Sequence, residues 1–333
     1  MLTSSRTPAG EWPPANSQAH ESDDDAPCAA FPLRETPFRA VTRWILGVAY
    51  ALHPQRIGSL PHLTLLTARD LMRGGTRLPD QNRTWAYPDT FGGVVRDLTP
   101  ESYLEGLRRG FFPWAHCGPL KWWTRAKRMV LSFDNLHISR RLLRHLKSGK
   151  YTVTFDMAFD RVVAQCGAPR AYNWHTLTWL TPSYMRLFSV LNRQGHAHSF
   201  EVWNEQGELV GGGYGVAIGR VFFTESQFSH ESNSSKMGFA SLMFHLAQWG
   251  YVANDGKDPT PTLDEAGFQP IPRADFEQLL REHGREGDHT GAWAVTATLA
   301  EIAEWEPSGV AKPAVQPAKA AKAAKLPKVK KAA

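Results

Sequence analysis

The sequence predicts an α+β fold with a mostly antiparallel central sheet. Two successive hairpins carry this prediction, because the apolar stretch 200–203 meets a turn at 204–207, returns at Leu209, and turns again at Ile218-Gly219. Stretches with helical apolar spacing lie on both sides of this meander. A hydrophobic content of 42% in 333 residues is enough for a real core.

Both ends of the chain differ in composition from its middle. Residues 1–30 are rich in Pro, Ser and Ala and lack an apolar period, so we expect a disordered extension. Residues 307–333 hold seven lysines and no acid, one charge more than the net +6 of the whole chain. We therefore interpret 286–333 as a C-terminal segment ending in a disordered Lys/Ala/Pro tail, which explains the basic pI.

Two protein classes are disfavoured. The most apolar run, 44–52, is too short to span a bilayer, and the N-terminus lacks the order of a secretory signal, so we expect a cytoplasmic protein without membrane contact. Cys28, Cys117 and Cys166 are odd in number and lack CxxC spacing, which argues against a disulfide framework and a zinc site.

Residues 31–150 are predicted to form a small N-terminal domain. Helical spacing is present at 41–48, and Thr99 followed by Pro100 starts a helix that Gly110 ends. From 106 to 150, eleven basic residues surround a single acid and alternate with aromatics. This mixture suits phosphate contact and base stacking at an unpaired nucleic-acid end, although a solvated helix face over an aromatic core explains it equally well. The candidate nucleic-acid contacts are Arg125, Lys127, Arg128, Arg140, Arg141 and Arg144.

Residues 151–285 are predicted to form the second domain. Outside the meander, the spacing predicts a strand at 151–155, helices at 156–166, 182–195, 239–249 and 274–282, and a Pro-rich loop from 256 to 271. The last of these helices is expected to close the folded part. Gly211-Gly212-Gly213 lies inside the meander without a following Lys-Ser/Thr, so close backbone approach explains it better than a phosphate loop.

Two carboxylates stand at the ends of apolar strands. Glu225 is in phase with Val221 and Phe223, which directs it to the interior, and Asp255 ends the short apolar stretch from Tyr251. From the residues alone, Asp255 is better explained as a turn former before Gly256, and Glu225 as an N-terminal partner of the next helix. His196 and His198 alternate on one strand without a third spaced metal ligand and are interpreted as structural.

Six motifs in order, over roughly residues 84 to 280, resemble the bacterial leucyl/phenylalanyl-tRNA-protein transferases. They are Gly110-Phe-Phe-Pro-Trp114, Lys121-Trp-Trp123, Leu136-His-Ile-Ser-Arg140, Gly195-His-Ala-His-Ser-Phe-Glu-Val-Trp203, Gly211-Gly-Gly-Tyr-Gly-Val216 and Glu225-Ser-Gln-Phe-Ser229. The resemblance implies a small N-terminal domain and a C-terminal domain similar to the GNAT acyltransferase fold. It also implies transfer of Leu, Phe or Met from aminoacyl-tRNA to a protein with N-terminal Arg or Lys, which marks that protein for N-end rule degradation, without metal, ATP or coenzyme.

The resemblance also assigns roles to residues. The catalytic aspartate falls on Asp255 and the pocket glutamate on Glu225, while Trp114 and Trp179 match tryptophans near the aminoacyl-adenosine end. Ser229 and Lys257 are further candidates for substrate binding. The chain departs from the family at Asp255-Gly256-Lys257, where Asp-Cys-Gln is usual, and at Thr262, where a histidine is usual. A lysine in place of a glutamine changes charge and hydrogen-bonding role beside the proposed centre.

Two other functions stay open from the sequence. The first is a related acyltransferase whose donor or acceptor is altered because of Lys257. The second is a non-catalytic RNA-binding relative in which the lysine tail supplies salt-sensitive affinity. A monomer is the default expectation.

Overall fold

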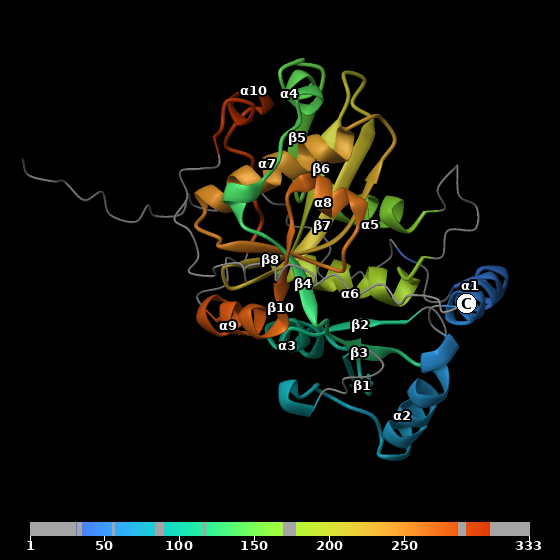
Figure 1. The fold of residues 1–333 in the computed structure, drawn as a ribbon. Coiled ribbons are helices and arrows are strands. Elements are labelled where there is room, and N and C mark those ends of the chain that lie inside the picture. Colours follow the sequence, from blue (N-terminus) through green and yellow to red (C-terminus); the bar gives the residue numbers. More distant parts are fainter. Residues whose placement is uncertain are drawn as a thin grey trace, which may run out of the picture.

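The computed structural model describes residues 31, 35–54, 57–83, 90–115, 118–168, 178–285 and 291–306. The predicted disordered segments, 1–30 and the lysine-rich tail from 307, lie outside these ranges. The described chain mixes helices with two sheets (Figure 1), as the α+β prediction requires. Within the described ranges, no helix has the length and apolar character needed to cross a membrane.

The elements follow the chain in this order. The helices are α1 (Pro37–Ala51), α2 (Leu60–Met72), α3 (Pro100–Arg108), α4 (Arg140–Leu146), α5 (Phe159–Gly167), α6 (Pro182–Arg193), α7 (Ser234–Gln248), α8 (Pro261–Ala266), α9 (Arg273–His283) and α10 (Leu299–Ile302), with 3₁₀ turns η1 (Ile57–Ser59), η2 (Gln81–Arg83) and η3 (Phe133–Asn135). The strands are β1 (Phe91–Val94), β2 (Phe112–Trp114), β3 (Lys121–Trp123), β4 (Lys127–Leu131), β5 (Thr152–Phe155), β6 (Ala197–Trp203), β7 (Leu209–Ile218), β8 (Val221–Ser229), β9 (Ala253–Lys257) and β10 (Gln269–Pro272).

The smaller sheet has the order β1-β3-β2 and lies beside α2 at the bottom of Figure 1. Trp122 of β3 is fully buried, and its indole nitrogen donates to the Thr76 carbonyl oxygen at 3.3 Å. The predicted helix start between β1 and β2 is confirmed, because Thr99 and Ser102 form a reciprocal capping box on α3.

The larger sheet has the order β10-β4-β9-β8-β7-β6-β5 and is antiparallel except for the pair β8 and β9. The predicted meander is confirmed as β6, β7 and β8. The sequence-based boundary at residue 150 does not coincide with the division between the sheets. It needs correction because β4 pairs with both β9 and β10 of the larger sheet.

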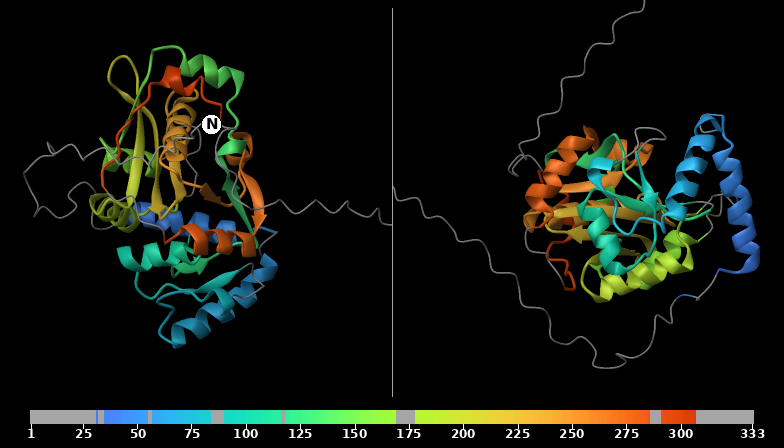
Figure 2. Two further views of the ribbon diagram at one scale, coloured as in Figure 1. Left: turned by 90° about the vertical axis from the view of Figure 1, so that its left-hand side faces the viewer. Right: turned by 90° about the horizontal axis from the view of Figure 1, so that it is seen from below.

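Helices cover the larger sheet on both faces (Figure 2). One apolar cluster joins the sheet to α3, α5, α6 and α9, and a second joins its other face to α4 and α7. The glycine triplet in β7 permits close approach, as predicted. A Cβ on Gly213 would lie 2.7 Å from the Phe200 ring, and one on Gly211 would lie 2.5 Å from the Ser234 hydroxyl.

Two predictions about the C-terminal part were wrong. The stretch expected to be a Pro-rich loop contains α8 and the strand β10, whose prolines fit because β10 is an edge strand paired on one side. The folded part also continues beyond α9, since Trp293 and Ile302 are 3% and 0% exposed and pack on the α7 side of the sheet.

Candidate active site

The neighbouring strands β8 and β9 each carry an irregularity at or beside one of the two predicted acidic residues. In the pairing of β7 with β8, Tyr214 faces Ser226 and Gly215 faces Thr224, so Glu225 is the extra residue of a bulge. In the pairing of β4 with β9, Gly256 is skipped in the same way, and the next residue, Lys257, has a φ of 63°. Bulges often redirect side chains beside active sites, and here both lie where the parallel pair β8 and β9 ends.

The Glu225 side chain is buried and both of its carboxylate oxygens are bound. The Tyr103 hydroxyl donates to Oε1 at 2.7 Å, and the Lys257 ammonium lies 2.7 Å from Oε2. The Glu225 side chain is 3% exposed, which confirms that it points to the interior. Burial raises the pKa of the Tyr103 phenol well above its usual range, and the Glu225 carboxylate adds to the rise. Tyr103 therefore keeps its proton and acts as a donor.

Asp255 is also enclosed within the protein. Arg128 forms a two-pronged contact with it, with Nε donating to Oδ1 at 2.9 Å and Nη2 to Oδ2 at 2.6 Å. Both side chains are 0% exposed, and the Lys257 backbone N–H donates to Oδ1 at 3.1 Å. The remaining Arg128 prong donates to the Gly110 carbonyl oxygen. Lys257 therefore contacts both acids, Glu225 through its ammonium and Asp255 through its backbone N–H. Both Asp255 oxygens are also occupied by Arg128.

The predicted tryptophans converge on the same face of the sheet as Glu225. The Trp179 ring packs edge-on against Tyr184 at 5.3 Å, and the Tyr184 hydroxyl donates to the Pro113 carbonyl oxygen, one residue before Trp114. Tyr184 stacks on Phe188, whose ring is 5.4 Å from the Tyr103 ring. Tyr103, Tyr184 and Phe188 belong to one buried apolar cluster, and both tryptophans pack against it.

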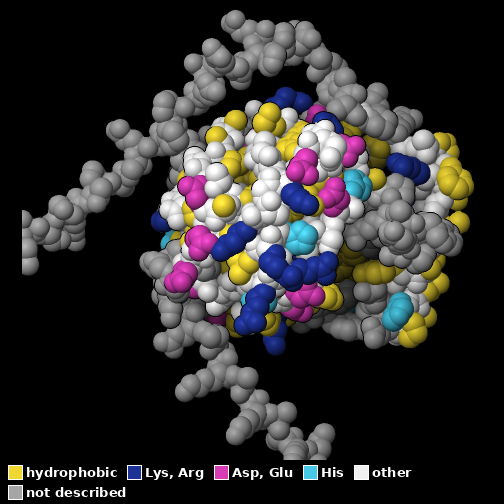
Figure 3. Space-filling view, turned by 90° about the horizontal axis from the view of Figure 1, so that it is seen from above, with side chains coloured by type: hydrophobic (Ala, Val, Ile, Leu, Met, Phe, Trp, Pro, Cys, Tyr) yellow, Lys and Arg dark blue, Asp and Glu magenta, His cyan; other side chains and the backbone are white. Residues whose placement is uncertain are grey.

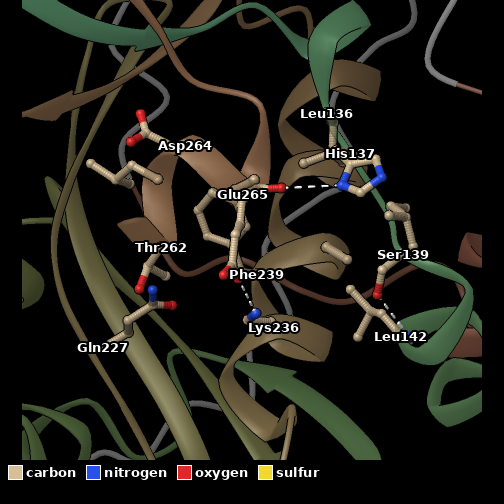
Figure 4. A pocket seen from close by; sticks show the side chains of 14 residues that line it. Leu136, His137, Ser139, Leu142, Gln227, Lys236, Phe239, Thr262, Asp264 and Glu265 are labelled. Carbon is tan, nitrogen blue, oxygen red and sulfur yellow. Dashed lines mark hydrogen bonds and ion pairs between the residues drawn. The ribbon is translucent and has the colours of Figure 1, made fainter. Parts of the chain in front are cut away.

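A cavity of about 340 Å³ opens on the α7 side (Figure 4). The surface of its wall is mostly apolar, with Leu142 of α4, Phe239 of α7 and Leu263 of α8, and the Lys236–Glu265 ion pair lies at the same wall. Gln227, two residues after Glu225, contributes a side-chain oxygen that is buried without a hydrogen-bond partner among the described residues. Thr262, the position of the expected family histidine, lines the same wall.

The basic residues predicted for nucleic-acid contact divide into two groups. Arg140, Arg141 and Arg144 are exposed on α4, at the end of the molecule viewed in Figure 3, where Lys and Arg side chains gather. Ser139 and Leu142 of the same segment line the cavity, so this basic helix borders it. Arg141 and Arg144 also line a second hollow with Lys150.

Two arginines in the other group are paired with carboxylates of the fold. Lys127 is exposed, but Arg125 pairs with Asp258 through two hydrogen bonds. Arg128 is fully buried, so its predicted role in tRNA contact was wrong. Its charge is required by Asp255, a partner that lies 127 residues further along the chain.

Ser229 and the histidines are engaged in the fold. The Ser229 hydroxyl accepts from the Ser235 backbone N–H at 3.0 Å and bonds the Ser234 and Ser235 hydroxyls, which ties β8 to the start of α7. His198 lies 2.8 Å from the Asp156 carboxylate and stacks on Trp293 at 3.6 Å, as expected of a structural histidine. Across the described ranges, no group of three His, Cys, Asp or Glu side chains is arranged to hold a metal ion.

Comparison with known proteins decides the family. The sequence profile described as Leucyl/phenylalanyl-tRNA protein transferase matches residues 130–281. A leucyl/phenylalanyl-tRNA--protein transferase of Pseudomonas fluorescens (strain SBW25) is 42% identical over 224 residues, which is 67% of this chain and 97% of that protein. The one of Stutzerimonas stutzeri (strain A1501) is 45% identical over 214 residues, 64% of this chain and 93% of that protein. The chain belongs to the leucyl/phenylalanyl-tRNA-protein transferase family.

Solved structures add less than the sequences do. A structure described as L-PGS from Bacillus licheniformis is 14% identical, with a TM-score of 0.28 and coverage of 44% of this chain and 45% of that one. This TM-score is too low to support an argument about the fold. Family membership therefore rests on the sequence relatives.

Sequence reasoning missed three parts of this transferase site. Tyr103 and Tyr184 were assigned only to helices, although each places a hydroxyl at the site. Arg128 was counted with the surface cations. A tyrosine on the buried side of a predicted helix was the one available signal, since a buried phenol usually finds a hydrogen-bond partner.

Proposed function

We propose that this chain transfers leucine, phenylalanine or methionine from aminoacyl-tRNA to an acceptor protein with N-terminal Arg or Lys, forming a peptide bond. In this family the product is marked for N-end rule degradation. The observation that carries the proposal is the meeting of three residues that match the family, Trp114, Trp179 and Glu225, around one apolar cluster. The chain also aligns with nearly the whole length of a transferase at 42% identity.

The reaction needs little besides positioning. An aminoacyl ester is activated, so its conversion to an amide is downhill without metal, ATP or coenzyme. An α-amine with a pKa of about 7.7 to 8 is partly neutral near pH 7 and can attack without a strong base. Holding amine and ester together can supply much of the rate, and the amine proton can leave with the ribose oxygen.

The cavity beside α7 is proposed to receive the donor side chain, which reaches it from the face that carries Glu225 past the end of β8, where Gln227 lines the cavity wall. A volume of about 340 Å³ and a mostly apolar wall suit Leu, Phe or Met. Apolar pockets separate ligands by about 1 to 3 kcal/mol per methylene, so acceptance of several donors is expected. Arg140, Arg141 and Arg144 lie on the helix that borders the cavity, where they can contact the tRNA backbone. Trp114 and Trp179 are proposed to stack against the terminal adenosine.

The two carboxylates are proposed to act through their partners. Asp255 has its oxygens held by Arg128 and by the Lys257 N–H, so we assign it a positioning role in place of the direct catalytic role that the resemblance implies. Glu225 is proposed to hold the Lys257 ammonium at the end of β9. Ser229 is assigned to the β8 to α7 connection, not to direct substrate contact.

The finer architectural expectations are also kept as proposals. We propose that the larger sheet with its flanking helices is a GNAT-like domain, supported by the parallel pair β8 and β9 within an otherwise antiparallel sheet. We place the start of this domain near β4, since that strand pairs within the larger sheet. We also propose that the protein is cytoplasmic and monomeric.

The test is direct. Purified full-length protein is mixed with leucyl-tRNA and a peptide beginning with Arg, and mass spectrometry should find a peptide heavier by one leucine residue. A peptide of the same sequence beginning with Ala serves as the matched control and should gain little. The proposal fails if no donor among leucyl-, phenylalanyl- and methionyl-tRNA extends any acceptor.

A related acyltransferase with a different acceptor is the second candidate. It is favoured by one observation, that Lys257 already neutralises Glu225. A cationic acceptor side chain would then find this carboxylate occupied. Product confined to acceptors that do not begin with Arg or Lys would favour this candidate.

A further inference from the structure

Lys257 stands at the junction of the two acidic residues. Its ammonium lies 2.7 Å from Glu225 Oε2 and donates to the Thr224 carbonyl oxygen at 3.0 Å. Its backbone N–H is held by Asp255, and the residue adopts a left-handed φ of 63°. A non-glycine residue in this conformation is uncommon and strained, and strain of this kind often marks functional sites.

One ammonium proton of Lys257 remains available. A lysine ammonium carries three N–H donors, and the described residues accept two of them. The side chain is 13% exposed, whereas those of Glu225, Asp255 and Arg128 are 3%, 0% and 0% exposed. Lys257 is therefore the charged group of this network that is most open to a ligand.

The network around Lys257 also fixes the direction of its ammonium group. Glu225 binds the ammonium from one side, while Tyr103 holds the other Glu225 oxygen and so orients the carboxylate. Asp255 is already balanced by Arg128. The formal charges of these two acid–base pairs sum to zero. The remaining N–H belongs to the Lys257 ammonium, which is held at the end of the parallel pair β8 and β9.

We propose that Lys257 is a catalytic residue whose free N–H donates to the carbonyl oxygen of the aminoacyl ester. This inference rests on the proposed transferase function. When the acceptor amine attacks, the carbonyl π electrons move to oxygen, and the resulting oxyanion gains a charge-assisted hydrogen bond from the ammonium. Donors aimed at the oxygen that develops charge favour the transition state over the ground state.

The proton and bond balance is simple. The amine nitrogen forms a bond to the carbonyl carbon, the oxyanion returns its electron pair, and the bond to the ribose oxygen breaks. The proton lost by the attacking nitrogen ends on that ribose oxygen. Lys257 keeps all three protons throughout, because its role is donation without transfer.

The test compares Lys257→Met with wild type in single-turnover transfer from leucyl-tRNA to whichever peptide the wild type extends best. Loss of an oxyanion donor predicts a fall in the rate constant of about 10²- to 10³-fold. Binding of a non-reactive donor, in which an amide replaces the ester, should change less than about twofold, because the effect belongs to the transition state. Arg281→Met, exposed on α9, is the matched control for loss of a cation and should transfer at the wild-type rate.

A second pair of variants guards against a folding defect. Lys257→Met leaves the buried Glu225 carboxylate without its cation. The same substitution is therefore also measured in a Glu225→Gln background, where no carboxylate is left unpaired. Within that background, Lys257→Met should still cost about tenfold or more in rate. An alkylammonium ion should partly restore Lys257→Ala.

Two results would overturn the inference and one would remove its basis. A Lys257→Met rate constant within about threefold of wild type, or a loss confined to binding of the amide-linked donor, excludes the oxyanion role. Wild-type protein that transfers no amino acid to any acceptor refutes the proposed function itself, and the inference with it.

Discussion

Replacing Arg128 by Met should strongly destabilise the protein, although the sequence places this arginine in a basic surface stretch. The substitution leaves the fully buried Asp255 carboxylate without its two-pronged partner and the Gly110 carbonyl oxygen without a donor. Breaking a buried ion pair from one side costs about 3 to 5 kcal/mol, since the remaining charge stays desolvated. At about 2 to 4 °C per kcal/mol for a chain of this size, the melting temperature should fall by about 6 to 20 °C.

Urea unfolding with a double-mutant cycle measures this effect. Arg128→Met, Asp255→Asn and the double variant are compared, and the double variant should be more stable than the sum of the single losses predicts, because it leaves no unpaired charge. Arg281→Met serves as the control and should change the free energy of unfolding by less than about 0.5 kcal/mol. An Arg128→Met loss as small as that of the control, with no coupling to Asp255, would refute the reasoning.

Three further predictions follow from other contacts. Burial lowers the pKa of His245, and its Nε2 accepts a hydrogen bond from the Thr296 N–H. The stability that neutral His245 contributes should therefore be complete above the unfolded pKa of about 6.5 and decline as the pH falls toward the lower folded pKa. Urea unfolding between pH 7.5 and 5 should show a steeper decline in the free energy of unfolding for wild type than for His245→Gln. Trp293→Ala should lower the free energy of unfolding by about 3 to 5 kcal/mol in urea unfolding, because it removes a buried ring that stacks on His198. A loss below about 1 kcal/mol would mean that the segment around Trp293 does not pack on the sheet in solution. The third prediction concerns the exposed arginines of α4, which are Arg140, Arg141 and Arg144. Changing all three to Gln should reduce the slope of log K against log salt for tRNA binding by about 2 and leave the melting temperature nearly unchanged. An unaltered slope would place the tRNA elsewhere.

Regular elements with local signals were predictable from the sequence. The start of α3 at Thr99-Pro100 and the meander of β6 to β8 carry their patterns within a few consecutive residues. The strands β4 and β10 were missed because they are five and four residues long and β10 contains two prolines. Their structure depends on a partner strand more than a hundred residues away in sequence.

The candidate site was predictable in its members more than in its connections. Alternation along β8 correctly directs Glu225 inward, but the bulge that places it opposite Lys257 depends on the register between two strands, which one strand's sequence does not contain. Arg128 illustrates the same limit. A basic residue among other basic residues gives no local sign that its partner is Asp255.

The charge balance of the network bears on how acceptors are selected. Glu225 is bound by Lys257 and Tyr103, and Asp255 by Arg128, so both carboxylates are satisfied before any substrate arrives. An incoming ammonium or guanidinium group would have to displace one of these partners, and displacing Arg128 would expose a buried charge at a cost of several kcal/mol. The available N–H of Lys257 attracts an oxygen and repels a cation. The network is therefore suited to stabilising the ester oxygen, and any preference for a cationic acceptor must come from side chains outside it.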